Sequence, residues 1–250
     1  MSLLQVRNAS RHFGSLVAVD DVSLVIEPGE LRAIIGPNGA GKTTFFNLIS
    51  GFFKPTSGVI LFDGKDIGAL TPEQRVQSGM ARTFQVTEIF PELSIADNLR
   101  IAVEVAAGLR MKVWLGAARR RAIDARVTEL LEMGNLADKR DGLVGALSHG
   151  DQRAAEILMA LALRPRLLML DEPTAGMGDQ ETYDIARLIR RLHQKERLAM
   201  LLIEHDMRVV FNLADRITVL AQGRVLAEGT PDGIAASETV QAAYLGKAAA

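Results

Sequence analysis

Short apolar runs alternate with amphipathic stretches along much of the chain. The mostly apolar runs at residues 31–35, 167–170 and 199–203 have the length and composition of strands buried on both faces. Residues 152–163 are typical of a helix, and residues 183–192 place four large aliphatic side chains on one helical face. Buried strands that alternate with helices predict an α/β core built around a parallel sheet.

The beginning of the chain has the pattern of antiparallel strands instead. The expected strands alternate apolar and polar residues or lie between turn signals, and they are residues 3–8, 17–19, 22–26 and 59–62. Pro28–Gly29 predicts a turn, and Asp63–Gly64 is a hairpin signal. Near the other end, residues 217–220 are expected to pair with 225–227 across Gln222–Gly223.

The sequence pattern changes between residues 86 and about 147, where helices are expected at 94–107 and 118–133. The second helix carries an amphipathic stripe at i, i+4, i+7 and i+8, formed by Ile123, Val127, Leu130 and Leu131. This region is interpreted as a helical insertion into the α/β core. We therefore predict one domain, with residues 1–85 and 152–250 as the core and 86–151 as a helical subdomain.

Residues 36–43 match the pattern G-x-x-x-x-G-K-[ST], and they lie between the expected strand at 31–35 and a helix at 43–49. Glycines in such a loop let successive N–H groups point into one concavity, toward which the helix also directs its positive end. A polyphosphate suits that concavity. The residues expected to bind it are Gly36, Asn38, Gly39, Ala40, Gly41, Lys42, Thr43 and Thr44. Lys42 would reach the β- and γ-phosphates, and the Thr43 hydroxyl would help to hold Mg²⁺.

Composition narrows the class of protein. The chain has 29 basic and 30 acidic residues, a balance that does not suggest a nucleic-acid partner. It contains no cysteine, which excludes disulfides and thiolate metal sites and fits a reducing compartment. No apolar run approaches the roughly 20 residues needed to span a bilayer, and no signal-peptide pattern is seen. We expect a soluble chain, or one attached to a membrane through a partner.

Polar residues follow three of the expected strands. Asp171 and Glu172 end the apolar run at 167–170, where Asp171 suits the hydration shell of Mg²⁺ and Glu172 suits the orientation of an attacking water. Gln85 follows a strand at 80–84, and His205 follows the strand at 199–203 and Glu204. Both could point at a γ-phosphate, Gln85 as a ligand of Mg²⁺ or water and His205 as a hydrogen-bond donor. A lone histidine after a strand is, however, more often an ordinary residue whose hydrogen bonds are satisfied locally.

A second helix start with anion-binding character is the segment Leu147-Ser148-His149-Gly150-Asp151-Gln152-Arg153. Its N–H groups and the Ser148 hydroxyl could receive a phosphate, or Ser148 could be an N-cap and nothing more. One ATP could be held by both helix starts only if they came together within a chain or across a dimer.

These motifs, in this order, resemble the ATP-binding subunits of ABC transporters. The resemblance covers essentially the whole chain and rests on GPNGAGKT at 36–43, ARTFQ ending at Gln85, LSHGDQR at 147–153, LLMLDEPTAG at 167–176 and LLIEHDM around His205. The residues of these motifs are most similar to those of the ATPases of branched-chain amino-acid importers, a group that includes urea and amide importers. VQAAYLG at 240–246 adds to this similarity.

The resemblance implies an α/β P-loop NTPase (RecA-like) core with an N-terminal antiparallel β-subdomain and an inserted α-helical signature subdomain. It implies a head-to-tail dimer, a homodimer or a heterodimer with a sister ATPase, that holds two MgATP between the phosphate loop of one chain and Ser148 and Gly150 of the other. Carried over to this sequence, it makes Glu172, His205, Gln85 and Lys42 catalytic, and Thr43, Gln85 and Asp171 the magnesium-binding residues.

The resemblance also settles the expected role of Phe13, which lies in a break between strands and from spacing alone could pack on a base or cap the sheet. The family places an adenine-stacking aromatic there. It further implies transmembrane permease subunits, with segment 86–97 as their docking place, a solute-binding protein as an indirect partner, and a peripheral location at the cytoplasmic face of the inner membrane. A core role for segment 86–97 stays open.

The chain departs from the usual family pattern at three positions. His149 replaces a glycine of the signature, Asp151 replaces its glutamine, and Gly178 stands where an aspartate is common. Asp151 lies in the first turn of a helix, where a carboxylate is favoured, and its side chain can point away from the phosphate. Hydrolysis is still expected. The competing hypotheses are an ABC ATPase of another system, such as lipopolysaccharide export, and a nucleotide-binding regulatory module with little turnover.

Overall fold

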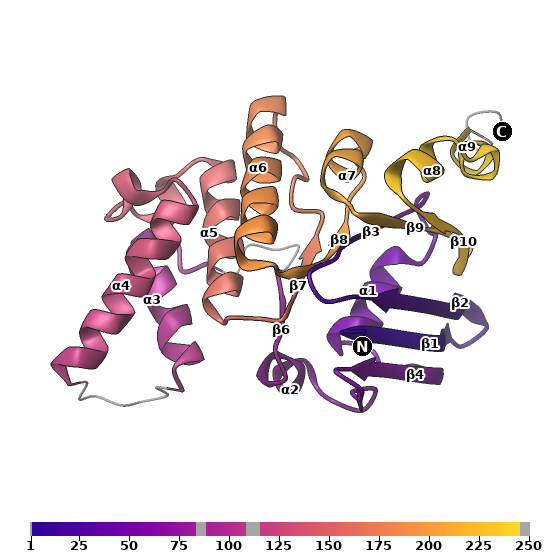
Figure 1. The fold of residues 1–250 in the computed structure, drawn as a ribbon, viewed down its shortest axis with the longest axis horizontal. Coiled ribbons are helices and arrows are strands. Elements are labelled where there is room, and N and C mark those ends of the chain that lie inside the picture. Colours follow the sequence, from indigo (N-terminus) through magenta and orange to yellow (C-terminus); the bar gives the residue numbers. More distant parts are fainter. Residues whose placement is uncertain (1, 84–88, 109–115, 246–250) are drawn as a thin grey trace.

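A computed structural model describes residues 2–83, 89–108 and 116–245 of the chain. Two sheets and a set of helices form it (Figure 1). Within these ranges, no helix is long and apolar enough to cross a membrane.

The larger sheet has the order β10-β9-β3-β8-β7-β6 in the described part of the chain. Its strands are β3 (Leu31–Ile35), β6 (Met80–Arg82), β7 (Leu167–Asp171), β8 (Ala199–Ile203), β9 (Arg216–Ala221) and β10 (Arg224–Gly229). All neighbours are parallel except β9 and β10, which form a hairpin across Gln222–Gly223. The predicted parallel α/β core and this C-terminal hairpin are confirmed, and because the strands are parallel, their carboxyl ends meet at one edge.

The smaller sheet is antiparallel, with the order β2-β1-β4-β5. Its strands are β1 (Leu4–Phe13), β2 (Leu16–Ile26), β4 (Ser57–Phe62) and β5 (Lys65–Asp66). The separation of residues 17–19 from 22–26 was wrong, because both belong to β2. The strand continues through a bulge where Asp21 has φ 56°, and Asn8 and Ser10 hydrogen-bond to Asp21 there.

The helices are α1 (Lys42–Ser50), α2 (Pro72–Gln77), α3 (Ile95–Ala106), α4 (Ala117–Met133), α5 (His149–Ala162), α6 (Asp179–Glu196), α7 (Met207–Leu213), α8 (Pro231–Ala235) and α9 (Glu238–Leu245). Short 3₁₀ turns occupy Ala137–Lys139 and Val144–Ala146. The predicted stripes on α4 and α6 are buried, as expected for faces that pack on a core. The helical region at 86–151 is therefore present, while its status as a separate subdomain stays a prediction.

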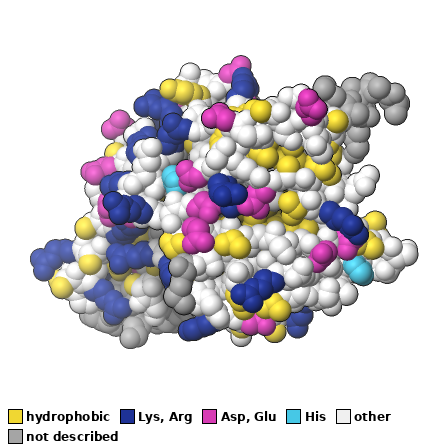
Figure 2. Space-filling view, turned by 45° about the vertical axis from the view of Figure 1, so that its right-hand side comes forward, with side chains coloured by type: hydrophobic (Ala, Val, Ile, Leu, Met, Phe, Trp, Pro, Cys, Tyr) yellow, Lys and Arg dark blue, Asp and Glu magenta, His cyan; other side chains and the backbone are white. Residues whose placement is uncertain are grey.

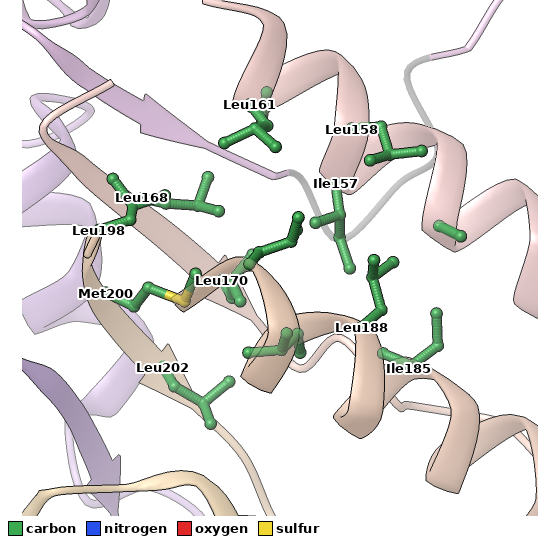
Figure 3. Close-up of a cluster of buried hydrophobic side chains, with 14 of the residues drawn as sticks. Ile157, Leu158, Leu161, Leu168, Leu170, Ile185, Leu188, Leu198, Met200 and Leu202 are labelled. Atoms are coloured by element: carbon green, nitrogen blue, oxygen red, sulfur yellow. The ribbon is translucent and has the colours of Figure 1, made fainter. Parts of the chain in front are cut away.

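Alternation along the central strands divides the core between two faces of the sheet. Leu168 and Leu170 point to the face covered by α5, α6 and α7, and Leu167 and Met169 point to the face covered by α1 and the antiparallel sheet. Figure 3 shows the first of these layers, where Leu170 and Met200 of the sheet meet side chains of α5 and α6. Packing on both faces explains why the central strands are almost entirely apolar.

The end of α1 is held by a buried arginine of α2. Arg75 is 1% exposed, and its Nη1 donates to the carbonyl oxygens of Leu48 and Ile49, each at 2.6 Å. These are among the last carbonyls of α1, which have no partner within the helix. Burial lowers the pKa of Arg75 to about 10, so the guanidinium remains charged at neutral pH.

We expect Arg75→Ala to lower the free energy of unfolding by about 2–4 kcal/mol, because it leaves buried carbonyls without donors. Urea denaturation followed by circular dichroism measures this loss. Arg121→Ala, at an exposed position of α4, is the matched control and should change the free energy by less than about 0.5 kcal/mol. A similarly small change for Arg75→Ala would show that Arg75 does not support α1.

Candidate functional site

The phosphate loop connects β3 to α1, as its flanking pattern predicted. A backbone hydrogen bond fixes it to the hairpin of the large sheet, since Gly223 N–H donates to Ala40 O at 3.0 Å, and the same hairpin is bonded to β2, since Asp20 N–H donates to Gly223 O at 2.8 Å. Asn38 and Gly39 at its tip are exposed, while Ala40 is buried. The loop is therefore a rigid support with an accessible tip.

Two glycines of this loop are required by contact as well as by conformation. A Cβ at Gly36 would lie 2.1 Å from Leu220 O, and one at Gly41, which has φ 96°, would lie 2.4 Å from Ala18 O. Gly39 has φ 78° but no atom within 4 Å of such a Cβ. The close approach of neighbouring strands therefore explains two of the glycines, and backbone conformation alone explains the third.

Lys42 is 6% exposed, and its Nζ donates to the carbonyls of Gly36 and Pro37 at 2.7 and 3.1 Å. The ammonium group is thus held inside the curve of the loop. Thr43 follows at the start of α1, where it is exposed. This arrangement places a cation, a hydroxyl group and a helix N-terminus at one concavity, as a polyphosphate requires.

Asp171 ends β7 and is completely buried. Its Oδ2 accepts a hydrogen bond from Arg82 Nη2 at 2.9 Å, and Arg82 also donates to Asn47 and Ser50 of α1 at 2.6 and 2.9 Å. Burial raises the pKa of the Asp171 carboxyl, and the Arg82 charge opposes that rise. Arg82 therefore places this carboxylate against the helix that follows the phosphate loop.

The other carboxylate oxygen of Asp171, Oδ1, is buried and has no hydrogen-bond partner. An orphaned anionic oxygen beside α1 fits a hydrated Mg²⁺, which binds through one or two carboxylates, waters and substrate phosphates. Within the described residues, no group of three or more His, Asp or Glu side chains could hold a metal without such a substrate. Thr43 and Asp171 thus remain suitable magnesium-binding residues.

Glu172 and His205 lie side by side at the ends of β7 and β8. Glu172 Oε1 and His205 Nε2 are 2.6 Å apart. Glu172 has φ 46°, a left-handed conformation that is uncommon for this residue type and directs the backbone away from the strand. The expected grouping of Asp171, Glu172 and His205 at the carboxyl edge of the sheet is present.

Ser148 is the N-cap of α5, and its Oγ accepts from the N–H of Asp151 at 3.2 Å. The Gly150 N–H donates to Oε1 of Glu181 on α6 at 3.1 Å. Both predicted phosphate contacts therefore lie at a helix start, and these two hydrogen bonds are made within α5 and to α6. The single chain contains two separate anion-binding helix starts.

Of the three departures from the family pattern, Asp151 has a local explanation, and nothing in the structure explains His149 and Gly178. Asp151 forms an ion pair with Lys139 at 2.5 Å, so its side chain is directed to a cation and its charge is compensated. Gly178 is the N-cap of α6 and supplies no side-chain hydrogen bond. His149 is exposed at the surface of α5.

Comparisons with known proteins agree with this geometry. The family described as "ABC transporter" matches residues 19–175. The chain is 40% identical over 252 residues to the high-affinity branched-chain amino acid transport ATP-binding protein BraF of Pseudomonas aeruginosa, with 98% of each chain covered.

The chain belongs to the ABC transporter family. It is an ATP-binding subunit and an ATPase. A second family, described as "Branched-chain amino acid ATP-binding cassette transporter", matches residues 224–250. LivG of Escherichia coli, with the same function in its name as BraF, is 40% identical with 98% of each chain covered. The lipopolysaccharide export ATP-binding protein LptB of Haemophilus influenzae is 35% identical, covering 99% of this chain and 98% of LptB.

The fold is similar to solved cassettes of this family. A structure described as the ADP conformation of an ATP-binding cassette from an ABC transporter has a TM-score of 0.85 and 30% identity, covering 98% of this chain and 99% of that one. A nucleotide-free cassette has a TM-score of 0.83 and 29% identity, with coverage of 98% and 99%. The predicted P-loop NTPase fold is thereby confirmed.

In this ABC transporter subunit, Phe13 ends β1 and is 39% exposed. Arg11 covers one face of its ring at 4.5 Å, and Phe53 contacts it edge-on at 5.2 Å. These contacts fix the ring and leave part of it accessible, which suits adenine stacking; that role stays a prediction. Gln85 and residues 86–88 lie outside the described residues.

Sequence reasoning missed three charged residues of the site: Arg82, Arg153 and Glu204. Arg82 binds Asp171, and Arg153 and Glu204 contact the backbone of the loop that carries Glu172. All three lie inside the motifs that carried the resemblance, so their position was a signal. Their charge gave no indication of a role in the site, because a charged residue beside a strand end is usually solvated.

The glycine contacts generate a paired prediction. Gly39→Ala should lower the free energy of unfolding by about 1–2 kcal/mol, because the alanine would have to adopt a left-handed backbone conformation. Gly41→Ala should cost about 1–3 kcal/mol more, because its Cβ overlaps Ala18 O. Thermal and urea unfolding of the nucleotide-free protein measure both losses, and equal losses would show that β2 can move away from the loop.

Proposed function

We propose that this chain is the ATP-hydrolysing subunit of an importer for branched-chain amino acids or related solutes. The observation that carries the proposal is the 40% identity to BraF and LivG over 98% of the chain. The match at residues 224–250 supports it, since that family is named for the same transport. The lower identity to LptB, 35%, makes lipopolysaccharide export the second candidate.

ATP would bind with its phosphates in the loop at 36–43 and its adenine on Phe13. The loop N–H groups and Lys42 offset phosphate charge, and because the Lys42 ammonium is already held by loop carbonyls, little reorganisation is needed. Thr43 and Asp171, and Gln85 from outside the described residues, would hold Mg²⁺. When bound, Mg²⁺ supplies charge stabilisation at the β- and γ-phosphates.

Glu172 is the proposed base that orients or deprotonates the attacking water, and His205 donates a hydrogen bond toward the transferring phosphoryl group. Their contact at 2.6 Å keeps each side chain in a defined place before substrate arrives. Most of the catalysis is then positional and electrostatic, as is usual for phosphoryl transfer.

The second half of each ATP site would come from another ATPase chain, either a second copy or a sister subunit. Ser148 is exposed at the start of α5, so a γ-phosphate on a partner's loop could reach it. Gly150 N–H is held by Glu181 in the single chain, and a phosphate would take the place of that carboxylate. In a head-to-tail pair of chains, the phosphate loop and the start of α5 of each chain would both contact the phosphates of an ATP.

The permease partners are expected to dock over two adjoining cavities of about 220 and 130 Å³ that share Arg82 and Leu163. Phe52, 48% exposed, lines the smaller cavity. Of the predicted docking segment 86–97, the described residue Phe90 is 49% exposed, which supports an outward-facing role. Acidic and basic side chains are interspersed over the face in Figure 2, so charge alone marks no docking surface there. This docking would hold the chain at the cytoplasmic face of the inner membrane.

The assignment of Glu172 predicts that Glu172→Gln retains ATP binding and loses at least about 100-fold in kcat, because the amide cannot act as a base. Phosphate release and binding of a fluorescent ATP analogue measure the two properties. We also expect the variant to accumulate an ATP-bound dimer, detectable by size-exclusion chromatography. Near-normal hydrolysis would remove Glu172 from the mechanism.

The docking proposal predicts that Phe90→Asp, at an exposed position of segment 86–97, lowers permease-stimulated hydrolysis while leaving the basal rate within about twofold, since a buried charge at an apolar contact weakens association. Val59→Asp, a change at an exposed position of β4 in the other sheet, is the matched control and should keep the stimulation. Equal stimulation of both variants would place the permease elsewhere.

A pull-down from native membranes separates the candidate functions. Recovery of two polytopic permeases supports import, and a solute-binding protein encoded beside them would indicate the solute class. Recovery of lipopolysaccharide-export components would favour the second candidate. If phosphate release stays undetectable when the co-purified permease is present, the chain is a nucleotide-binding regulatory module instead.

A further inference from the structure

The loop that carries Glu172 lies between two buried charges of opposite sign. On one side, Arg153 of α5 is 7% exposed and donates hydrogen bonds to the three consecutive backbone carbonyls of residues 171–173. On the other side, Glu204 is 3% exposed, and its Oε1 accepts from the N–H and the hydroxyl group of Thr174 at 2.9 and 2.5 Å. The carbonyls of residues 171–173 and the Thr174 N–H thus have charged partners of opposite sign.

The second oxygen of Glu204 binds the loop that carries His205. Oε2 accepts from the backbone N–H groups of His205 and Asp206 at 2.8 and 3.4 Å. The Glu172 N–H in turn donates to Ile203 O at 2.9 Å. One buried side chain therefore connects the two loops whose side chains meet at the Glu172–His205 contact.

The chemistry of this contact needs a carboxylate. All four groups that Glu204 binds are donors in these hydrogen bonds, and an ionised carboxylate is the side chain that accepts at both oxygens without donating. A glutamine of the same shape would turn its NH₂ group toward the Thr174 N–H or toward the N–H groups of the His205 loop. In either orientation, a buried donor would face another donor.

We propose that Glu204 is a positioning residue for ATP hydrolysis, which holds Glu172 and His205 in the geometry that the reaction uses. This inference rests on the proposed roles of Glu172 and His205. Glu204 contacts backbone groups of both loops, so it acts on the reaction through these two side chains.

The test is Glu204→Gln, studied in the full-length chain with its permeases. We expect kcat to fall about 10- to 100-fold, because misplacing a catalytic group by about 1 Å costs about 100-fold. The KM for ATP should stay within about twofold, since the phosphate loop and Phe13 are untouched. An unchanged kcat, or a loss that appears in KM alone, would overturn the proposal.

Glu30→Gln is the matched control for removal of a largely buried carboxylate. Glu30 has a side chain that is 10% exposed, accepts from the Glu27 N–H at 2.9 Å and pairs with Arg32 at 2.6 Å. It lies before β3, at the end of the strand opposite to the phosphate loop. We expect this variant to lose stability and keep its kcat; an equal loss of kcat would mean that any buried carboxylate matters, and the proposal would fail.

A double-mutant cycle distinguishes positioning from general structural support. If Glu204 acts through His205, adding Glu204→Gln to His205→Ala should reduce kcat much less than it does in the wild type. Fully additive losses would contradict the proposal. Should Glu204→Gln not fold, Thr174→Val, which removes one of the four hydrogen bonds, enters the same cycle with a smaller expected loss.

Failure of the proposed function would look different. If both Glu172→Gln and His205→Ala hydrolyse ATP normally, the assignment of the catalytic pair is wrong. If those two variants lose turnover while Glu204→Gln keeps it, the pair stands and the role of Glu204 alone is rejected.

Discussion

Charge buried at the carboxyl edge of β7 and β8 is the constraint on which the rest of this structure depends. Asp171 has no exposed surface, and desolvation disfavours its charged form. Arg82 offsets that cost by its contact at 2.9 Å, and the same guanidinium lies over the rings of Phe46 and Phe52 at 4.7 and 5.0 Å. The carboxylate proposed to bind Mg²⁺ is thus linked by one side chain to α1 and to the rim of the proposed docking cavities.

The same principle extends to the loop that carries Glu172. Arg153 and Glu204 supply charges of opposite sign to its carbonyl and N–H groups, and Glu156 pairs with Arg153 at 2.7 Å. Arg153 belongs to α5, which has Ser148 as its N-cap, so one helix contacts the loop of Glu172 and carries the segment proposed to meet a partner's phosphate loop. In a dimer, each α5 would therefore contact both ATP sites.

Much of this arrangement could be predicted from sequence because it follows from local pattern. The apolar strands, the stripes of α4 and α6 and the strand and helix that flank residues 36–43 all have short-range signals, and each was confirmed. The bulge at Asp21 was missed because it depends on a cross-strand hydrogen bond from Asn8. Arg82 and Glu204 were missed for a similar reason, since their roles exist only once distant strands lie side by side.

The two helix starts proposed to bind phosphate are held by different parts of the chain. Ser148 Oγ accepts from the Asp151 N–H and the Gly150 N–H donates to Glu181, whereas the phosphate loop is hydrogen-bonded to the β9–β10 hairpin and packs closely on β2. The central claim is therefore that a second ATPase chain supplies the missing half.

The most direct measurement uses the absence of cysteine from the sequence. Ser148→Cys, labelled with a thiol-linked photoreactive group in the complex purified with its permeases, should cross-link in the presence of MgATP to another ATPase chain. Mass spectrometry should find the adduct on that chain's phosphate loop. Adducts confined to the labelled chain or to the permeases, under conditions in which ATP is bound, would contradict the account.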